Sequence, residues 1–118
     1  MPFRIEPTSG VAVFEQLRTQ VIDGVREGSM PTGSKLPTVR GLADELGIAP
    51  NTVAKAYRLL EADGVIETRG RAGTFVSAHG DAIEQQAQRA AAAYADRIRE
   101  LGVPADEALE LVAAALRA

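Results

Sequence analysis

The polar residues best suited to ligand chemistry stand close together in the middle of the 118-residue chain. Asn51 and Lys55 are four residues apart, so on a helix they project from one face. An amide and an ammonium at this spacing can pair with the edges of adenine and guanine, and Thr52 between them can meet a phosphate or a thymine methyl group. The alternative is that Asn51 and Thr52 only start a helix and that Lys55 is solvated.

A second group of candidate residues is basic. Arg69 and Arg71 flank Gly70 in a short loop, and an arginine held by a loop can enter the minor groove of DNA. Arg40 lies in the first turn of a predicted helix, where the N-terminus attracts phosphate and a guanidinium can bind it through two hydrogen bonds. The alternatives are a solvated turn for the loop and a weak surface ion pair between Arg40 and Asp44.

Enzymatic or metal chemistry has no comparable pattern. The chain has no cysteine, and its one histidine, His79, stands at a predicted joint, where a solvated linker residue is the simpler interpretation. The loop 69–73 lacks the strand-to-helix context of a phosphate-binding loop. We therefore predict no enzyme activity, cofactor or metal, and no residue identifies a small-molecule effector. Without a signal peptide or an apolar run of membrane-spanning length, the chain is expected to be cytoplasmic.

Hydrophobic periodicity predicts the first of the helices that must position these residues. It covers residues 11–26, with Ser9 or Gly10 as its cap and Gly28 at its end. An irregular arm precedes it. The predicted apolar face consists of Val13, Phe14, Leu17, Val21, Ile22 and Val25.

Two further helices are predicted to form a helix-turn-helix. Thr38 caps a short helix that ends before Gly47, and Pro50 fits the first position of a third helix, which Gly64 stops. Two helices joined by a turn of about three residues that contains glycine are typical of this motif. Their predicted buried positions are Val39, Leu42, Ala43, Leu46, Val53, Ala56, Tyr57 and Leu60.

The β-prone runs 65–68 and 74–77 flank the loop 69–73, which predicts a hairpin directly after the third helix, that is, a wing. A loop with two prolines and a glycine spans residues 29–37, with at most a short strand at 35–36.

The last third of the chain has a different character. Residues 80–118 carry four Lys and Arg against seven Asp and Glu, whereas residues 1–79 carry nine of each. Two helices are predicted in this tail, separated by Gly102 and Pro104. Because two helices alone cannot bury both of their apolar stripes, we expect the tail to form a homodimer. The stripes are Ala87, Ala91, Tyr94, Ile98 and Leu101 on one helix and Leu109, Val112, Ala113 and Leu116 on the other.

One stretch resembles a known family. The sequence GSKLPTVRGLADELGIAPNTVAKAYRLLEADGVIETRGRAGTFV is similar to the DNA-binding domain of the GntR family, and VFEQLRTQVIDGVREGSMPTG before it looks like that family's first helix and loop. The segment APNTVAKAY and the short two-helix tail resemble the YtrA subfamily, whose members are similar in size and pair through their tail helices.

The resemblance implies a mostly helical fold with a small β-hairpin: a winged helix-turn-helix over 1–79 and a dimerisation tail over 80–118. It implies a dimeric repressor that binds an inverted repeat, with helix 50–63 in the major groove and wing 69–73 in the minor groove. The alternative is a winged-helix module for protein–protein interaction, which the acidic net charge favours. The expected DNA contacts are Lys35, Thr38, Arg40, Pro50, Asn51, Thr52, Lys55, Arg58, Arg69, Gly70 and Arg71.

Two positions depart from the family pattern. Ala49 stands where a capping Ser or Asn is expected, which weakens the start of the third helix by about 1 kcal/mol. Gly41 lies inside the second helix, where a better helix former is usual. Both departures predict lower stability and leave the expected contacts in place.

Overall fold

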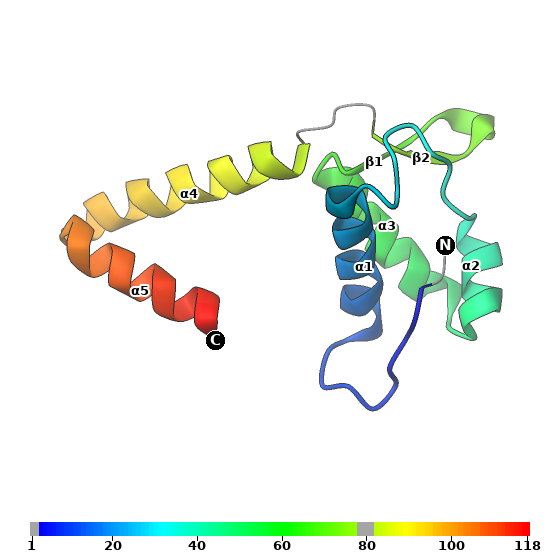
Figure 1. Ribbon diagram of the computed structural model, residues 1–118, viewed down its shortest axis with the longest axis horizontal. Coiled ribbons are helices and arrows are strands. Elements are labelled where there is room, and N and C mark those ends of the chain that lie inside the picture. Colours follow the sequence, from blue (N-terminus) through cyan, green and yellow to red (C-terminus); the bar gives the residue numbers. More distant parts are fainter. Residues whose placement is uncertain (1–2, 78–81) are drawn as a thin grey trace. The chain divides into compact units, whose positions relative to one another are not determined.

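The computed structural model describes residues 3–77 and 82–118, and it is mostly helical (Figure 1). His79 lies outside these residues. By its internal contacts the chain divides into two compact units, Met1–Ile83 and Glu84–Ala118. None of the described helices is long and apolar enough to cross a membrane.

The first unit contains three helices, α1 (Val13–Glu27), α2 (Val39–Leu46) and α3 (Pro50–Ala62). The three predicted helices are confirmed, but the start of α1 differs. Neither Ser9 nor Gly10 caps this helix, because Ala12 takes the cap position without a side-chain hydrogen bond. The Ser9 hydroxyl instead accepts a hydrogen bond from the Val11 N–H at 3.1 Å and closes a turn before the helix.

Local signals define both ends of α2 and the start of α3. The Thr38 hydroxyl caps α2 by accepting a hydrogen bond from the Gly41 N–H at 3.0 Å. Gly47 ends α2 with a φ of 67°, a conformation that glycine adopts readily. Pro50 then begins α3, and Ala49 before it offers no capping side chain, as predicted.

Gly41 has a role that its low helix propensity did not indicate. A Cβ atom at this position would lie 2.9 Å from the Thr38 hydroxyl oxygen, so close that one of the two atoms would have to shift. The absence of a side chain therefore leaves room for the hydroxyl that caps α2. The capping hydrogen bond from the Gly41 N–H offsets part of the stability that glycine is expected to cost inside a helix.

The core of the first unit forms where α1, α2 and α3 pack together with the hairpin. Leu17 and Val21 of α1 are fully buried, and so is Leu60 of α3. Val39 and Leu46, both predicted to be buried, are only half-buried, because they lie at the two ends of the short helix α2. The buried cluster consists of Leu17, Val21, Met30, Leu36, Leu42, Ala43, Val53, Ala56, Tyr57, Leu60, Val65, Ile66 and Val76.

The wing is an antiparallel hairpin of β1 (Ile66–Thr68) and β2 (Thr74–Val76), joined through a short 3-10 turn at Gly70–Ala72. The segment before α2 runs along the free edge of β2. The Leu36 N–H donates to the Thr74 carbonyl at 2.8 Å, and the residue before it, Lys35, forms a single bridge with Phe75. The predicted strand at 35–36 is thus an isolated bridge, and backbone hydrogen bonds of Gly33 and Ser34 with Val76 continue the contact with β2.

The remaining helices are α4 (Ala82–Leu101) and α5 (Ala105–Arg117), and the second unit consists of α4 from Glu84 onward together with α5. Gly102 and Pro104 separate the two helices as predicted, with Gly102 directly after α4 and Pro104 at the cap position of α5. The Tyr94 hydroxyl joins the two helices by donating a hydrogen bond to the Ala108 carbonyl at 2.8 Å.

Candidate nucleic-acid interface

The exposed face of α3 carries polar residues that were expected to contact DNA. Asn51, Lys55 and Arg58 are exposed and lie on one side of the helix, since they are three or four residues apart. Pro50 at the start of the helix is exposed, and Thr52 is half-buried. The opposite side of α3 is packed into the core, so this helix presents a fixed polar stripe to solvent.

Lys55 has an intramolecular partner that the sequence pattern did not indicate. Its ammonium nitrogen lies 3.9 Å from the centroid of the Phe14 ring, in the first turn of α1. The next residue, Glu15, accepts two hydrogen bonds from the Arg18 guanidinium, at 2.8 and 3.1 Å. These hydrogen bonds hold the pKa of the Glu15 carboxyl below its usual value, and the charge of Lys55 lowers this pKa further. Lys55 is therefore attached to α1 by a cation–π contact before any ligand binds.

Arg40 lies in the first turn of α2 and is exposed. Within the described residues, no ion pair joins it to Asp44, the partner considered from the sequence. The Thr38 hydroxyl, another expected contact, already accepts the capping hydrogen bond of this helix. Arg40 thus extends from a capped helix with its guanidinium available to a ligand.

A buried tyrosine fixes the start of α2 against α3. The Tyr57 hydroxyl donates a hydrogen bond to the Pro37 carbonyl at 2.8 Å, twenty residues back along the chain. Burial raises the pKa of this hydroxyl to about 12. Sequence periodicity identified Tyr57 as a core residue but not as a link between the two helices of the motif. This hydrogen bond fixes the backbone at Pro37 against α3, and it therefore also positions Thr38 and Arg40, which follow Pro37 in the chain.

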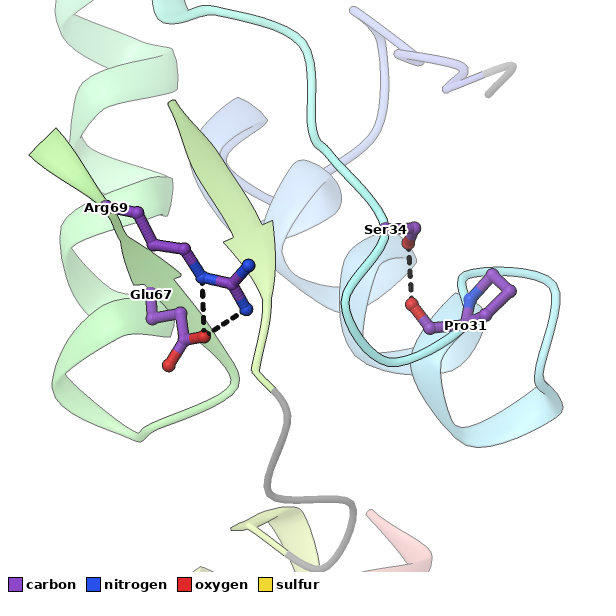
Figure 2. Close-up of polar contacts among 4 residues, drawn as sticks. All are labelled: Pro31, Ser34, Glu67 and Arg69. Carbon is purple, nitrogen blue, oxygen red and sulfur yellow. Dashed lines mark hydrogen bonds and ion pairs between the residues drawn. The ribbon is translucent and has the colours of Figure 1, made fainter. Parts of the chain in front are cut away.

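The two arginines of the wing have different surroundings. Figure 2 shows the Arg69 guanidinium against Glu67, where Nε and Nη2 both donate to one carboxylate oxygen, at 3.0 and 2.6 Å. The guanidinium carbon also lies 4.4 Å from the centroid of the Phe75 ring. Arg71 is exposed in the 3-10 turn, next to Gly70. The wing therefore has one arginine that is bound to neighbouring side chains, Arg69, and one that is exposed to solvent, Arg71.

The side chain of Lys35 lies against the wing, although this residue precedes α2 and is far from the hairpin in sequence. Its Cε atom would be 2.8 Å from a Cβ atom at Gly73, so the lysine chain crosses directly over this glycine. Gly73 has a φ of 115°, which side-chain-bearing residues rarely adopt. In the loop 29–37, next to Lys35, Ser34 closes a turn by donating a hydrogen bond from its hydroxyl to the Pro31 carbonyl at 2.6 Å (Figure 2).

Two glutamines attach the N-terminal arm to α1. Gln20 pairs with the backbone of Arg4, accepting from its N–H at 2.9 Å and donating to its carbonyl at 2.6 Å. Gln16 pairs in the same way with the backbone of Glu6, at 2.8 and 3.1 Å. Phe3 packs against the core beyond these pairs. The arm was expected to be irregular, and the spacing of four residues between two glutamines was the signal that could have indicated its attachment.

The residues expected at a dimer interface are largely uncovered in the second unit. Leu109 is 68% exposed and Leu116 is 81% exposed, whereas Ala108 is buried between the two helices. Leu111 is also exposed and was missed, because it lies beside the stripe rather than in it. Of the other expected positions, Tyr94, Ile98 and Val112 are half-buried and Ala87, Ala91 and Leu101 are exposed.

The sequence profile described as "Bacterial regulatory proteins, gntR family" matches residues 11–76, which include α1, the helix-turn-helix and the wing. The HTH-type transcriptional regulator Rv1152 of Mycobacterium tuberculosis is 50% identical over 106 residues, which cover 90% of this chain and 87% of the relative.

Two further comparisons concern proteins called YtrA. The HTH-type transcriptional repressor YtrA of Bacillus subtilis is 47% identical over 75 residues, 63% of this chain and 57% of that protein. The solved structure of YtrA from Sulfolobus acidocaldarius, described as a GntR-family transcription factor, superposes with a TM-score of 0.62 and 30% identity. The superposed region covers 76% of this chain and 97% of the Sulfolobus acidocaldarius chain.

Proposed function

The chain belongs to the GntR family of bacterial regulatory proteins, and from this premise we propose that it is a homodimeric repressor that recognises an inverted-repeat operator. As a member of this family it is a DNA-binding transcription regulator and not an enzyme. Repression is proposed because the similar protein of Bacillus subtilis is named a repressor. Residues 1–79 would bind DNA, and residues 80–118 would pair the subunits.

The observation that carries the proposal is the polar stripe on α3, whose opposite side is fixed in the core. In a helix-turn-helix protein the N-terminal part of the second helix of the motif enters the major groove. Asn51 would then reach adenine and Lys55 guanine, with Lys55 leaving Phe14 to do so. Arg40 would bind a phosphate next to the groove, and the loop 69–73 would enter the adjacent minor groove.

The uncovered leucines of the second unit support pairing of two copies. Leu101, Leu109, Leu111 and Leu116 are each more than half exposed, and large exposed apolar side chains grouped on two consecutive helices are typical of a protein interface. A twofold axis between the tails would present two copies of α3 to the DNA. The operator would then contain two inverted half-sites about one helical turn apart.

The experiment is a selection of duplex DNA from a random-sequence library on the full-length protein, followed by fluorescence anisotropy titration of the selected duplex at several salt concentrations. We expect an enriched inverted repeat that binds roughly 10³-fold more tightly than a random duplex. The affinity should fall with salt only moderately, because the DNA-binding part of the chain has no net positive charge. Absence of any enriched sequence at low salt would contradict the proposal.

Single substitutions then test the interface itself. We expect Arg40→Ala to weaken binding to all duplexes and to lower the salt slope by about one, the signature of a lost phosphate contact. Asn51→Ala should cost about 1–3 kcal/mol, mostly on the selected duplex. Arg26→Ala is the matched control, because Arg26 is exposed at the end of α1 and is not among the expected contacts. Wild-type affinity in the Arg40 and Asn51 variants would overturn the assignment.

A further inference from the structure

The two arginines of the wing differ in what they would give up on binding DNA. Arg69 makes two hydrogen bonds to Glu67 and stacks on Phe75 (Figure 2). Arg71 is exposed, and within residues 3–77 no ion pair or side-chain hydrogen bond engages it. If an arginine must first break its contacts with a carboxylate and an aromatic ring, this cost offsets part of the free energy gained by binding a phosphate. An arginine without such contacts loses only conformational freedom.

The partners of Arg69 lie on both strands of the hairpin. Glu67 of β1 stands directly opposite Phe75 of β2, so a side chain that contacts both joins the two strands across their pairing. The Arg69 backbone N–H also donates to the Gly73 carbonyl at 2.8 Å and closes the loop from which Arg71 extends. Arg69 thus holds the hairpin closed through its backbone and through its side chain at the base of this loop.

The charges around the two arginines also distinguish Arg69 from Arg71. The carboxylate of Glu67 lies within 2.6 Å of the Arg69 guanidinium, so the pair together offers little net charge to a phosphate. Arg71 has no acidic partner in the described part of the chain and keeps its full charge. The wing of a DNA-binding protein is expected to direct its uncompensated arginine into the minor groove.

We propose that Arg71 is the DNA-contacting residue of the wing and that Arg69, held by Glu67 and Phe75, is the positioning residue that orients it. The proposal rests on the function proposed above and refines it by giving the two arginines different roles. Since Arg69 acts through Arg71, removal of Arg69 costs affinity only while Arg71 is present. Since Glu67 holds Arg69 in place, removal of this acidic residue weakens binding, although it makes the protein less negative.

The test uses full-length protein and the duplex that the wild type selects from a random-sequence library. Dissociation constants are measured by anisotropy for Arg71→Ala, Arg69→Ala, the double variant of both, and Glu67→Ala. Glu45→Ala is the matched control for Glu67→Ala, because Glu45 is exposed on α2 and has no ion-pair partner among the described residues. Thermal unfolding followed by circular dichroism establishes that each variant is folded.

We expect Arg71→Ala to raise Kd roughly tenfold and to lower the salt slope by about one. Arg69→Ala should raise Kd severalfold in the wild-type background and should change nothing further once Arg71 is absent. Glu67→Ala should weaken binding, whereas Glu45→Ala should leave it equal or slightly tighter, because it removes a negative charge from the unit proposed to bind DNA.

Three results would overturn the proposal. Additive effects of the two arginine substitutions would make both residues independent contacts. Tighter binding by Glu67→Ala than by Glu45→Ala would mean that Glu67 competes with DNA for Arg69. Unchanged affinity in Arg71→Ala would remove its assigned role. Failure of the function proposed above has a different signature: the wild type selects no duplex, or Arg40→Ala binds like the wild type.

Discussion

The two compact units of this chain bury very different amounts of apolar surface. Among the residues that the structure describes, the first unit has a core cluster of thirteen buried residues, in which Leu17, Leu42 and Leu60 are fully inaccessible. In the second unit, Ala108 is the one buried hydrophobic residue among those described, and Leu116 is almost as exposed as in an unfolded chain. Both units contain amphipathic helices, so the difference lies in what covers their apolar faces.

This difference indicates which unit folds by itself. A buried cluster contributed by three helices and a hairpin supplies most of the stability of a small domain. Two helices that leave their leucines in water lack this contribution, and a partner must supply it if the pair is to persist. We therefore expect core substitutions to unfold the first unit and tail substitutions to dissociate the proposed dimer. The predictions below, from the largest effect to the smallest, test this division.

The largest effect is expected from truncation of a core leucine. Leu60→Ala should lower the free energy of unfolding by about 3 kcal/mol, because it leaves a cavity in a fully packed site. Its neighbour Leu59 is 37% exposed on the same helix, so Leu59→Ala should cost less than about 1 kcal/mol. Urea unfolding measures both variants. Equal losses would mean that the first unit is not stabilised by its own core.

A substitution in the tail should act on association instead. Leu109→Ala should weaken the proposed dimer by about 2 kcal/mol, roughly thirtyfold in the dimer dissociation constant, and should leave unfolding of the first unit unchanged. Sedimentation over a range of protein concentrations measures this constant. Glu110→Ala, at an exposed neighbouring position, is the control. A Leu109 variant that remains fully dimeric at low concentration would contradict the assignment of this face.

Each unit also has one tyrosine whose hydroxyl donates to a backbone carbonyl, Tyr57 to Pro37 and Tyr94 to Ala108. Tyr57→Phe should cost about 1 kcal/mol in unfolding of the first unit, because it removes the hydrogen bond that a buried tyrosine donates to the half-buried Pro37 carbonyl. Tyr94→Phe should affect only the tail.

The pKa of Tyr57 adds a dependence on alkaline pH. Since burial raises this pKa from 10.0 to about 12, the folded state favours the neutral hydroxyl, and the associated stability is fully present below pH 10 and is lost as pH rises toward 12. Tyr57→Phe should remove this part of the decline, as urea unfolding between pH 8 and pH 12 would show, whereas Tyr94→Phe should retain it. An alkaline profile that is the same in the wild type and Tyr57→Phe would contradict the prediction.

The smallest effect concerns ion pairs. The pKa of Glu15 is lowered by its hydrogen bonds to Arg18, so the pair stabilises the first unit above the unfolded-state pKa of the carboxyl, and this stability is lost as pH falls through the folded-state value. Glu15→Gln should therefore be slightly destabilising at pH 7 and neutral in acid, as thermal unfolding at both pH values would show. Asp96→Asn in the second unit should have no measurable effect, because both side chains of its pair with Arg99 are largely exposed.

Most of the fold could be predicted from the sequence, because its signals act over a few residues. Apolar spacing indicated the inner faces of α1 and α3, Thr38 and Pro50 indicated two helix starts, and the glycines at 28, 47 and 102 indicated three helix ends. The residues on the exposed face of α3 followed from the same spacing. The start of α1 was predicted too early, because two turn-forming residues before the helix could not be distinguished from caps.

The sequence by itself therefore determined which segments are helices, which of their faces are apolar and which polar residues remain outside. Only the tertiary structure decided the partners of those polar residues: Lys55 lies on Phe14, Tyr57 reaches Pro37, and Gln16 and Gln20 hold the arm. Arg69 and Arg71 both flank Gly70 in the sequence, and only the pairing of the two hairpin strands shows that Arg69 contacts Glu67 and Phe75 whereas Arg71 is exposed. Helix and turn signals arise from neighbours along the chain, whereas the contacts of Lys55, Tyr57 and the two glutamines join segments that only packing of the core brings together.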